Sequence, residues 1–158
     1  MNINVAVLDN DGSFLQVTKE ALEKHFSIST THDTNYFIDN IKEPVIAVID
    51  WYLDYGIVGI DVMRRVREHS PLCHFIFVSS LVSKEILMTV INEGWGCYFI
   101  EKAKSDFFDE LIGRIKQAKI VLNQKLEAAT IAVTNNQKLQ KTLEETLKTL
   151  DSSNGRTD

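Results

Sequence analysis

The chain has 158 residues, of which 44% are apolar and 25% charged, and its formal net charge is −5. This composition is typical of one globular domain with an extension. No apolar run approaches the roughly 20 residues that span a bilayer, the first residues lack a signal-peptide pattern, and no basic stripe is present. We therefore expect a cytoplasmic protein that contacts neither membrane nor nucleic acid directly.

Apolar runs and helical patterns alternate along the first 120 or so residues. The runs predict strands over residues 3–8, 27–31, 45–49, 75–78 and 98–100. Between them, the spacing of apolar residues predicts helices over residues 14–26, 34–41, 60–69 and 83–93. This alternation predicts an α/β fold, in which helices cover both faces of a doubly wound, five-stranded parallel sheet.

The last helical pattern is longer than the others. It begins near Ser105, and no Gly or Pro interrupts residues 114–154. Steps of four and three from Ile115 to Leu150 give a seam in which eight of eleven positions are apolar, and Asn136 and Gln140 form polar layers. This seam predicts a coiled coil and a parallel homodimer. The alternative is that residues 134–136 break the helix.

These patterns divide the chain into three parts. We expect a compact domain over residues 1–118, a helical coiled-coil extension over residues 119–150 and a disordered tail over residues 151–158.

An aspartate directly after a wholly apolar run is the strongest functional signal. Residues 45–49 read Val-Ile-Ala-Val-Ile, which suits a strand buried on both faces, and Asp50 follows. Because parallel strands end at the same edge of a sheet, residues after the other strands should lie near it. They are Asp9, Asn10 and Asp11 after the first strand, Ser79 after the fourth and Lys102 after the fifth.

This set of residues indicates a chemistry. Neighbouring carboxylates repel one another unless a cation joins them, and oxygen ligands favour a hard divalent ion, Mg²⁺ above all. Lys102 and Ser79 could then hold the oxygens of a phosphoryl group, and Asp50 could attack phosphorus to form an aspartyl phosphate. Turn or helix-capping roles are the simpler alternative, and that alternative is stronger for Asp11 than for Asp9.

In this order and spacing, the chain resembles a bacterial response regulator receiver domain over about residues 3–118. The segments that carry the resemblance are residues 5–11, 45–50, 59–63, 75–80 and 99–102. The resemblance implies a flavodoxin-like sheet with strand order 2-1-3-4-5. It also implies a two-component signalling switch that accepts phosphoryl from a histidine kinase or phosphotransfer protein. Such a switch is not an enzyme, apart from slow loss of its own phosphoryl group.

The resemblance also implies a role for each site residue. Asp50 would be the phosphoacceptor, and Ser79 and Lys102 would bind the phosphoryl oxygens. Either Phe99 or Tyr98 would report the switch on the face of the fourth helix, fifth strand and fifth helix. The Mg²⁺ ligands would be Asp9, Asn10, Asp50 and the backbone carbonyl of Tyr52.

Several positions depart from the family's pattern. Asn10 replaces an acid, so weaker Mg²⁺ binding is expected, with Asp11 as an accessory acid. Asp54 replaces a Pro, and Tyr52 places a bulky ring beside the phosphoacceptor. One alternative is therefore a pseudo-receiver, a phosphorylation-independent interaction or dimerisation module. Another is a phosphatase with an aspartyl nucleophile, based on the Asp-x-Asp spacing of Asp9 and Asp11.

Overall fold

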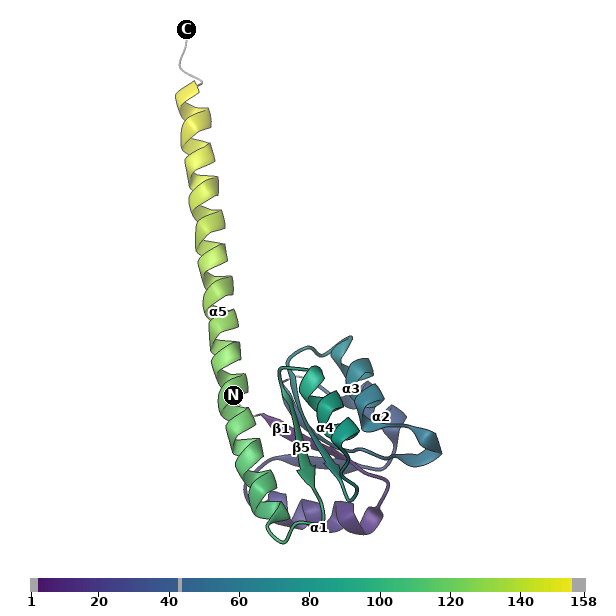
Figure 1. Cartoon of the computed structure of the whole chain (residues 1–158). Coiled ribbons are helices and arrows are strands. Elements are labelled where there is room, and N and C mark those ends of the chain that lie inside the picture. Colours follow the sequence, from purple (N-terminus) through teal and green to yellow (C-terminus); the bar gives the residue numbers. More distant parts are fainter. Residues whose placement is uncertain (1–2, 43, 155–158) are drawn as a thin grey trace. The chain divides into compact units, whose positions relative to one another are not determined.

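The computed structural model describes residues 3–42 and 44–154, and five parallel strands form the centre of its first, compact unit (Figure 1). The sheet order is β2-β1-β3-β4-β5, as predicted. β3 and β4 lie in the middle of the sheet and are buried along their whole length. The strands are β1 (Asn4–Leu8), β2 (Ile28–Thr31), β3 (Val45–Asp50), β4 (Cys73–Ser79) and β5 (Cys97–Glu101).

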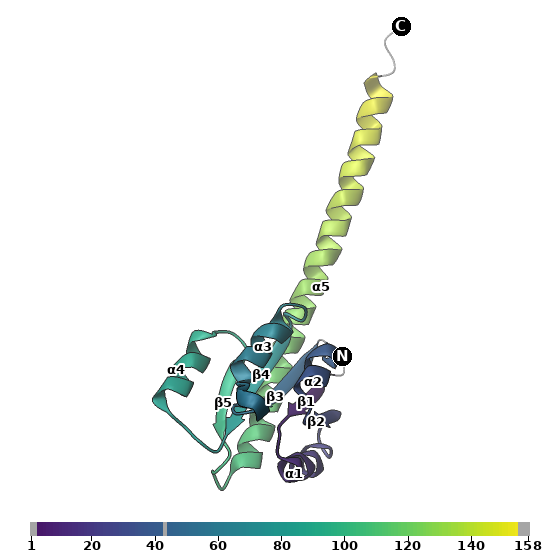
Figure 2. The same cartoon turned by 90° about the vertical axis from the view of Figure 1, so that its right-hand side faces the viewer.

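Helices cover both faces of this sheet, as the alternating pattern predicted. α2, α3 and α4 pack on one face, and α1 together with the first part of α5 packs on the other (Figure 2). Each face of the sheet therefore has its own apolar core. The helices are α1 (Gly12–Leu22), α2 (Thr34–Asn40), α3 (Gly59–Arg67), α4 (Lys84–Asn92) and α5 (Phe107–Asn154), with a 3-10 turn η1 (Asp54–Gly56) before α3.

The first helix differs from its predicted bounds of 14–26. It begins at Gly12, because the side chain of Asp11 accepts hydrogen bonds from the backbone N–H groups of Ser13 and Phe14. It ends at Leu22, after which the chain turns toward β2. The apolar spacing alone could not place either end, because a cap and a turn decide them.

α5 is continuous through residues 134–136, so these residues do not break the helix. Its buried residues continue beyond the expected boundary at 118, and Leu122 is fully buried against the sheet's core. The chain accordingly divides into one compact unit that ends at Leu122 and a second that begins at Asn123. Residues 151–154 of the predicted tail are helical, and residues 155–158 lie outside the described residues.

The second unit carries exposed apolar side chains along its helix. Each of the following side chains is at least half exposed: Ile131, Val133, Leu139, Leu143, Leu147 and Leu150. No helix within residues 3–42 and 44–154 combines the length and the apolar character that a membrane crossing requires.

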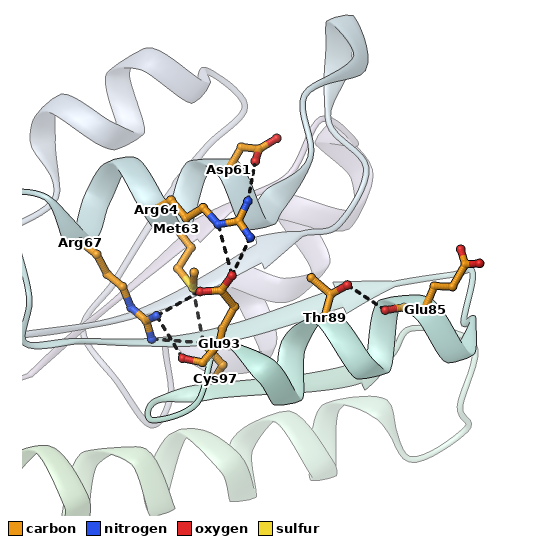
Figure 3. Close-up of polar contacts among 8 residues, drawn as sticks. All are labelled: Asp61, Met63, Arg64, Arg67, Glu85, Thr89, Glu93 and Cys97. Carbon is orange, nitrogen blue, oxygen red and sulfur yellow. Dashed lines mark hydrogen bonds and ion pairs between the residues drawn. The ribbon is translucent and has the colours of Figure 1, made fainter.

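A network of charged side chains joins α3 to the end of α4. Figure 3 shows the Glu93 carboxylate between the guanidinium groups of Arg64 and Arg67. Arg64 Nη2 lies 2.7 Å from Glu93 Oε1, and Arg67 Nη2 donates to the backbone carbonyl of Trp95 at 2.7 Å. The network holds the connection between α4 and β5, because Glu93 caps α4 and Trp95 precedes β5.

Candidate functional site

The register of the sheet brings the predicted site residues to one edge. Leu8 pairs with Ile49, so Asp9 and Asp50 follow neighbouring positions on adjacent strands. Asp50 in turn pairs with Val78, and Ser79 lies beside Glu101. The strand-end residues therefore meet at the carboxyl edge, as the sequence predicted.

Lys102 joins the two carboxylates at this edge. Its ammonium lies 2.6 Å from Asp9 Oδ2 and 3.0 Å from Asp50 Oδ1, and 4.1 Å from the centre of the Phe14 ring. Asp9 and Asp50 are both buried. Two carboxylates share one ammonium, so the site keeps an excess negative charge that a further cation could neutralise.

The pKa of Asp50 is raised from 3.8 to about 6. Burial is the largest cause and the negative charge of Asp9 adds to it, whereas Lys102 opposes both. The raised pKa means that the surroundings of Asp50 destabilise its charged form. Raised pKa values of this kind are common for carboxyl groups at functional sites. A cation at this edge would favour the charged form that acts as a nucleophile.

Ser79 is the last residue of β4 and is buried at the same edge. Its Oγ accepts a hydrogen bond from the backbone N–H of Leu81 at 3.1 Å, and its carbonyl accepts one from the N–H of Lys102 at 2.8 Å. The backbones that carry Ser79 and Lys102 are therefore directly linked. The Ser79 hydroxyl keeps its own proton available as a donor, since the bond to Leu81 uses only a lone pair.

The loop after β3 is closed by a bridge between Tyr52 and Val58. The N–H of Gly59 donates to the carbonyl of Trp51 at 2.9 Å, and that of Leu53 donates to the carbonyl of Ile57 at 3.0 Å. In an antiparallel pair bonded through its flanking residues, the central residue directs its own N–H and C=O away from the partner strand. The Tyr52 carbonyl is therefore not used by the bridge and can serve as a ligand.

The donor set fits Mg²⁺ bound partly through water. Mg²⁺ in proteins commonly uses one or two carboxylates and keeps several waters. Asp9 and Asp50 supply two buried carboxylates, and the Tyr52 carbonyl and the Asn10 amide offer neutral oxygens. In the described part of the chain, no group of three or more His, Cys, Asp or Glu side chains could hold a metal ion. The described residues therefore do not form a metal site built from three or more acidic side chains.

Asn10 and Asp11 use their side chains differently. Asn10 is exposed, and its Nδ2 donates to Asp54 Oδ1 at 2.9 Å. Asp11 is the N-cap of α1, an alternative that the sequence left open for it, and its role as an accessory acid stays a prediction. The sequence did not predict the contact between Asn10 and Asp54, although both residues follow strands that it placed at one edge of the sheet.

Phe99 and Tyr98 lie on opposite faces of β5. Phe99 packs against the core under α2, α3 and α4. Tyr98 packs on the other face, where its ring stacks on His74 with centroids 5.3 Å apart. Because alternate residues of a strand face opposite sides, only one of the two can face α4, and that residue is Phe99.

Solved structures match this fold, whereas no protein-family model and no curated protein matches the sequence. The BeF3-activated receiver domain of DrrB, an OmpR/PhoB homologue from Thermotoga maritima, is 21% identical, with a TM-score of 0.65; the match covers 75% of this chain and 97% of that chain. A CheY-like receiver domain from Methanospirillum hungatei is 19% identical, with a TM-score of 0.68, over 79% and 99% of the two chains. The receiver domain of the Francisella response regulator 1452 is 26% identical, with a TM-score of 0.62, over 78% and 99%.

Proposed function

We propose that this chain, which has the fold of response regulator receiver domains, is the phosphoacceptor of a two-component signalling system. The observation that carries the proposal is the arrangement of Asp50, Asp9 and Lys102 at the carboxyl edge of the sheet. A nucleophilic carboxylate, a second acid and an ammonium are the groups that transfer of phosphoryl to an aspartate requires.

The reaction follows from the positions of these groups. A carboxylate oxygen of Asp50 attacks the phosphorus of a phosphohistidine on a kinase or phosphotransfer protein, the P–N bond breaks, and its electron pair returns to the imidazole. Lys102 leaves Asp50 and binds a phosphoryl oxygen, and the Ser79 hydroxyl donates to another. Mg²⁺, held by Asp9, Asp50, Asn10 and the Tyr52 carbonyl, would supply positive charge to the phosphoryl oxygens when bound.

A cavity beside Lys102 gives a partner room to approach. It has a volume of about 500 Å³, and both polar and aromatic side chains line it, among them Asp11, Ser13, Phe14, Lys102 and Phe108. Such a mixed surface suits a partner protein that presents a phosphohistidine to the site. We therefore expect the histidine kinase or phosphotransfer protein to dock between α1 and the start of α5.

The output of the switch would be read on the face that contains α4. Phe99 faces this side of the sheet, and α4 exposes Leu87, Met88 and Ile91. When Lys102 and Ser79 turn to the phosphoryl group, the backbone that links them would shift β5 and the packing of α4. This is a change in population between two packings, driven by one charge.

The helical extension would dimerise the protein. The exposed leucines at 143, 147 and 150 follow the heptad seam, and an exposed apolar stripe on a long helix is stabilised by a second helix. We expect a parallel dimer, measured by light scattering coupled to gel filtration. A chain that remains monomeric at high concentration would rule this part of the proposal out.

The phosphorylation test uses a small phosphodonor with Mg²⁺ and intact-mass measurement. The wild type should gain the mass of one phosphoryl group, and Asp50→Ala should gain none. Asp39→Asn, a change of one exposed acid on α2, is the control that should be phosphorylated normally. No adduct on the wild type, together with no stabilisation by a beryllofluoride mimic, would overturn the proposal.

The second candidate is a pseudo-receiver that acts without phosphate. It is favoured by the ion pairs of Lys102, which already bridges both carboxylates, and by the neutral Asn10. In that case the assay above gives no adduct while the dimer still forms. Turnover of a simple phosphate ester would instead indicate a phosphatase.

A further inference from the structure

One polar contact joins the loops that follow β1 and β3. Asn10 Nδ2 donates a hydrogen bond to Asp54 Oδ1 at 2.9 Å. The two residues are 44 positions apart in the sequence, so the sheet and not the local chain brings them together. The contact lies next to Asp9 and four residues after Asp50, at the edge where the cation is proposed.

The chemistry of this contact sets the orientation of the Asn10 amide. A side-chain amide has a donor end, the NH₂ group, and an acceptor end, the carbonyl oxygen. An ionised carboxylate only accepts hydrogen bonds, so Asp54 binds the NH₂ end and disfavours the flipped amide. The carbonyl oxygen, which is the only end that can bind a cation, is thereby left for the site.

The loop that carries Asp54 is itself held in place. The carbonyl of Asp54 accepts from the N–H of Ile57 at 3.2 Å, inside the segment closed by the bridge between Tyr52 and Val58. Tyr55 adopts a left-handed backbone with φ of 59°, which non-glycine residues rarely do. Such a conformation persists where the surrounding structure determines it, so Asp54 is presented from a defined loop.

We propose that Asp54 is a positioning residue for the cation site. It orients the Asn10 amide so that its carbonyl oxygen can serve as a ligand, whereas a carboxylate at position 10 would not need to be oriented. The two oxygens of a carboxylate are equivalent, whereas an amide binds a cation through one end only. Groups that orient a metal ligand typically change metal affinity by about 10-fold to 100-fold when removed. The inference rests on the proposed function, because that function places Mg²⁺ at this edge.

The test is a Mg²⁺ titration of metal-free full-length protein, without a phosphodonor. Tryptophan fluorescence, to which Trp51 directly after Asp50 contributes together with Trp95, reports binding. The rise in urea stability with Mg²⁺ gives a second measure of the same affinity. Each variant is compared with its own metal-free stability, so a general loss of folding is separated from a loss of binding. Asp39→Asn is the control for the change in net charge.

Three variants separate orientation from charge. Asp54→Ala should weaken Mg²⁺ binding about 10-fold. Asp54→Asn should also weaken binding, because an amide at position 54 can donate as well as accept and no longer excludes the flipped Asn10 amide. In an Asn10→Asp background, Asp54→Ala should change the affinity by less than about twofold, because a carboxylate at position 10 needs no orientation.

The other possible outcomes each contradict a specific part of the proposal. The same loss in the Asn10→Asp background would mean that Asp54 acts by charge alone and would overturn the positioning role. Full affinity in Asp54→Asn would contradict orientation by an acceptor-only group and would overturn it too. Unchanged affinity in Asp54→Ala would overturn it as well, while leaving the phosphoacceptor function standing. No Mg²⁺ binding by the wild type would overturn both.

Discussion

At Gly59, the first residue of α3, the helix passes very close to the strand that carries the proposed phosphoacceptor. A Cβ atom added at this position would lie 2.6 Å from the backbone carbonyl oxygen of Asp50, 3.1 Å from Ile49 Cγ2 and 3.3 Å from Phe77 Cδ1. Ordinary contacts between carbon and oxygen are about 3.3 Å or longer, so backbone would have to move by roughly 0.7 Å. Forcing a methyl group into a packed core costs about 1–3 kcal/mol, and the better helix propensity of Ala returns at most about 1 kcal/mol.

We therefore expect Gly59→Ala to lower the free energy of unfolding by about 1–2 kcal/mol. It should also slow phosphorylation, because the N–H of Gly59 donates to Trp51 and a shift of this bond moves the residue beside Asp50. Urea unfolding followed by circular dichroism gives the stability, and intact mass against time gives the rate.

Gly113→Ala is the matched control within α5. A Cβ at Gly113 meets nothing within 4 Å, so this variant should gain up to about 1 kcal/mol from helix propensity and be phosphorylated at the wild-type rate. If Gly59→Ala were as stable as the wild type, or if the two variants behaved alike, the close approach of α3 to β3 would be refuted.

Two further predictions concern charged groups. In metal-free buffer, Asp50→Asn should stabilise the protein by up to about 3 kcal/mol near neutral pH and by almost nothing near pH 4. The reason is that the carboxyl pKa rises from 3.8 to about 6 on folding, so the wild type loses stability as pH rises through that window. Urea unfolding at both pH values checks this, and an equal gain at both would contradict it. Glu93→Gln should cost about 0.5–1 kcal/mol, less in high salt, because Glu93 pairs with Arg64 and Arg67 between α3 and α4. Asp61 is an exposed residue that also pairs with Arg64, so Asp61→Asn should cost less than half as much. An equal loss of stability would argue against an anchoring role for Glu93.

The order of strands and helices was predictable from the sequence for a simple physical reason. Strands buried on both faces read as uninterrupted apolar runs, and residues 45–49 of β3 and 75–78 of β4 have this pattern. The first helix was placed less well, since its start depends on the Asp11 cap and its end on a turn. Periodicity finds the middle of an element, whereas single hydrogen bonds decide its ends.

The residues of the candidate site were also predictable as a set. Asp9, Asp50, Ser79 and Lys102 each follow or end a strand, and parallel strands must end at one edge. That argument places residues at the edge without telling which atoms meet. The bridge from Lys102 to both carboxylates and the raised pKa of Asp50 depend on burial and on distances between residues far apart in the chain.

Two features were decided only by the tertiary structure. The alternation of side chains along β5 assigns Phe99 to the face of α4 and Tyr98 to the opposite face, which required the register of the strand. The contact between Asn10 and Asp54 required two loops to meet across 44 residues. The sequence by itself determined that a carboxylate ends a buried strand, because apolar pattern is local; which partners surround that carboxylate is a property of the packed sheet, because those partners come from other strands.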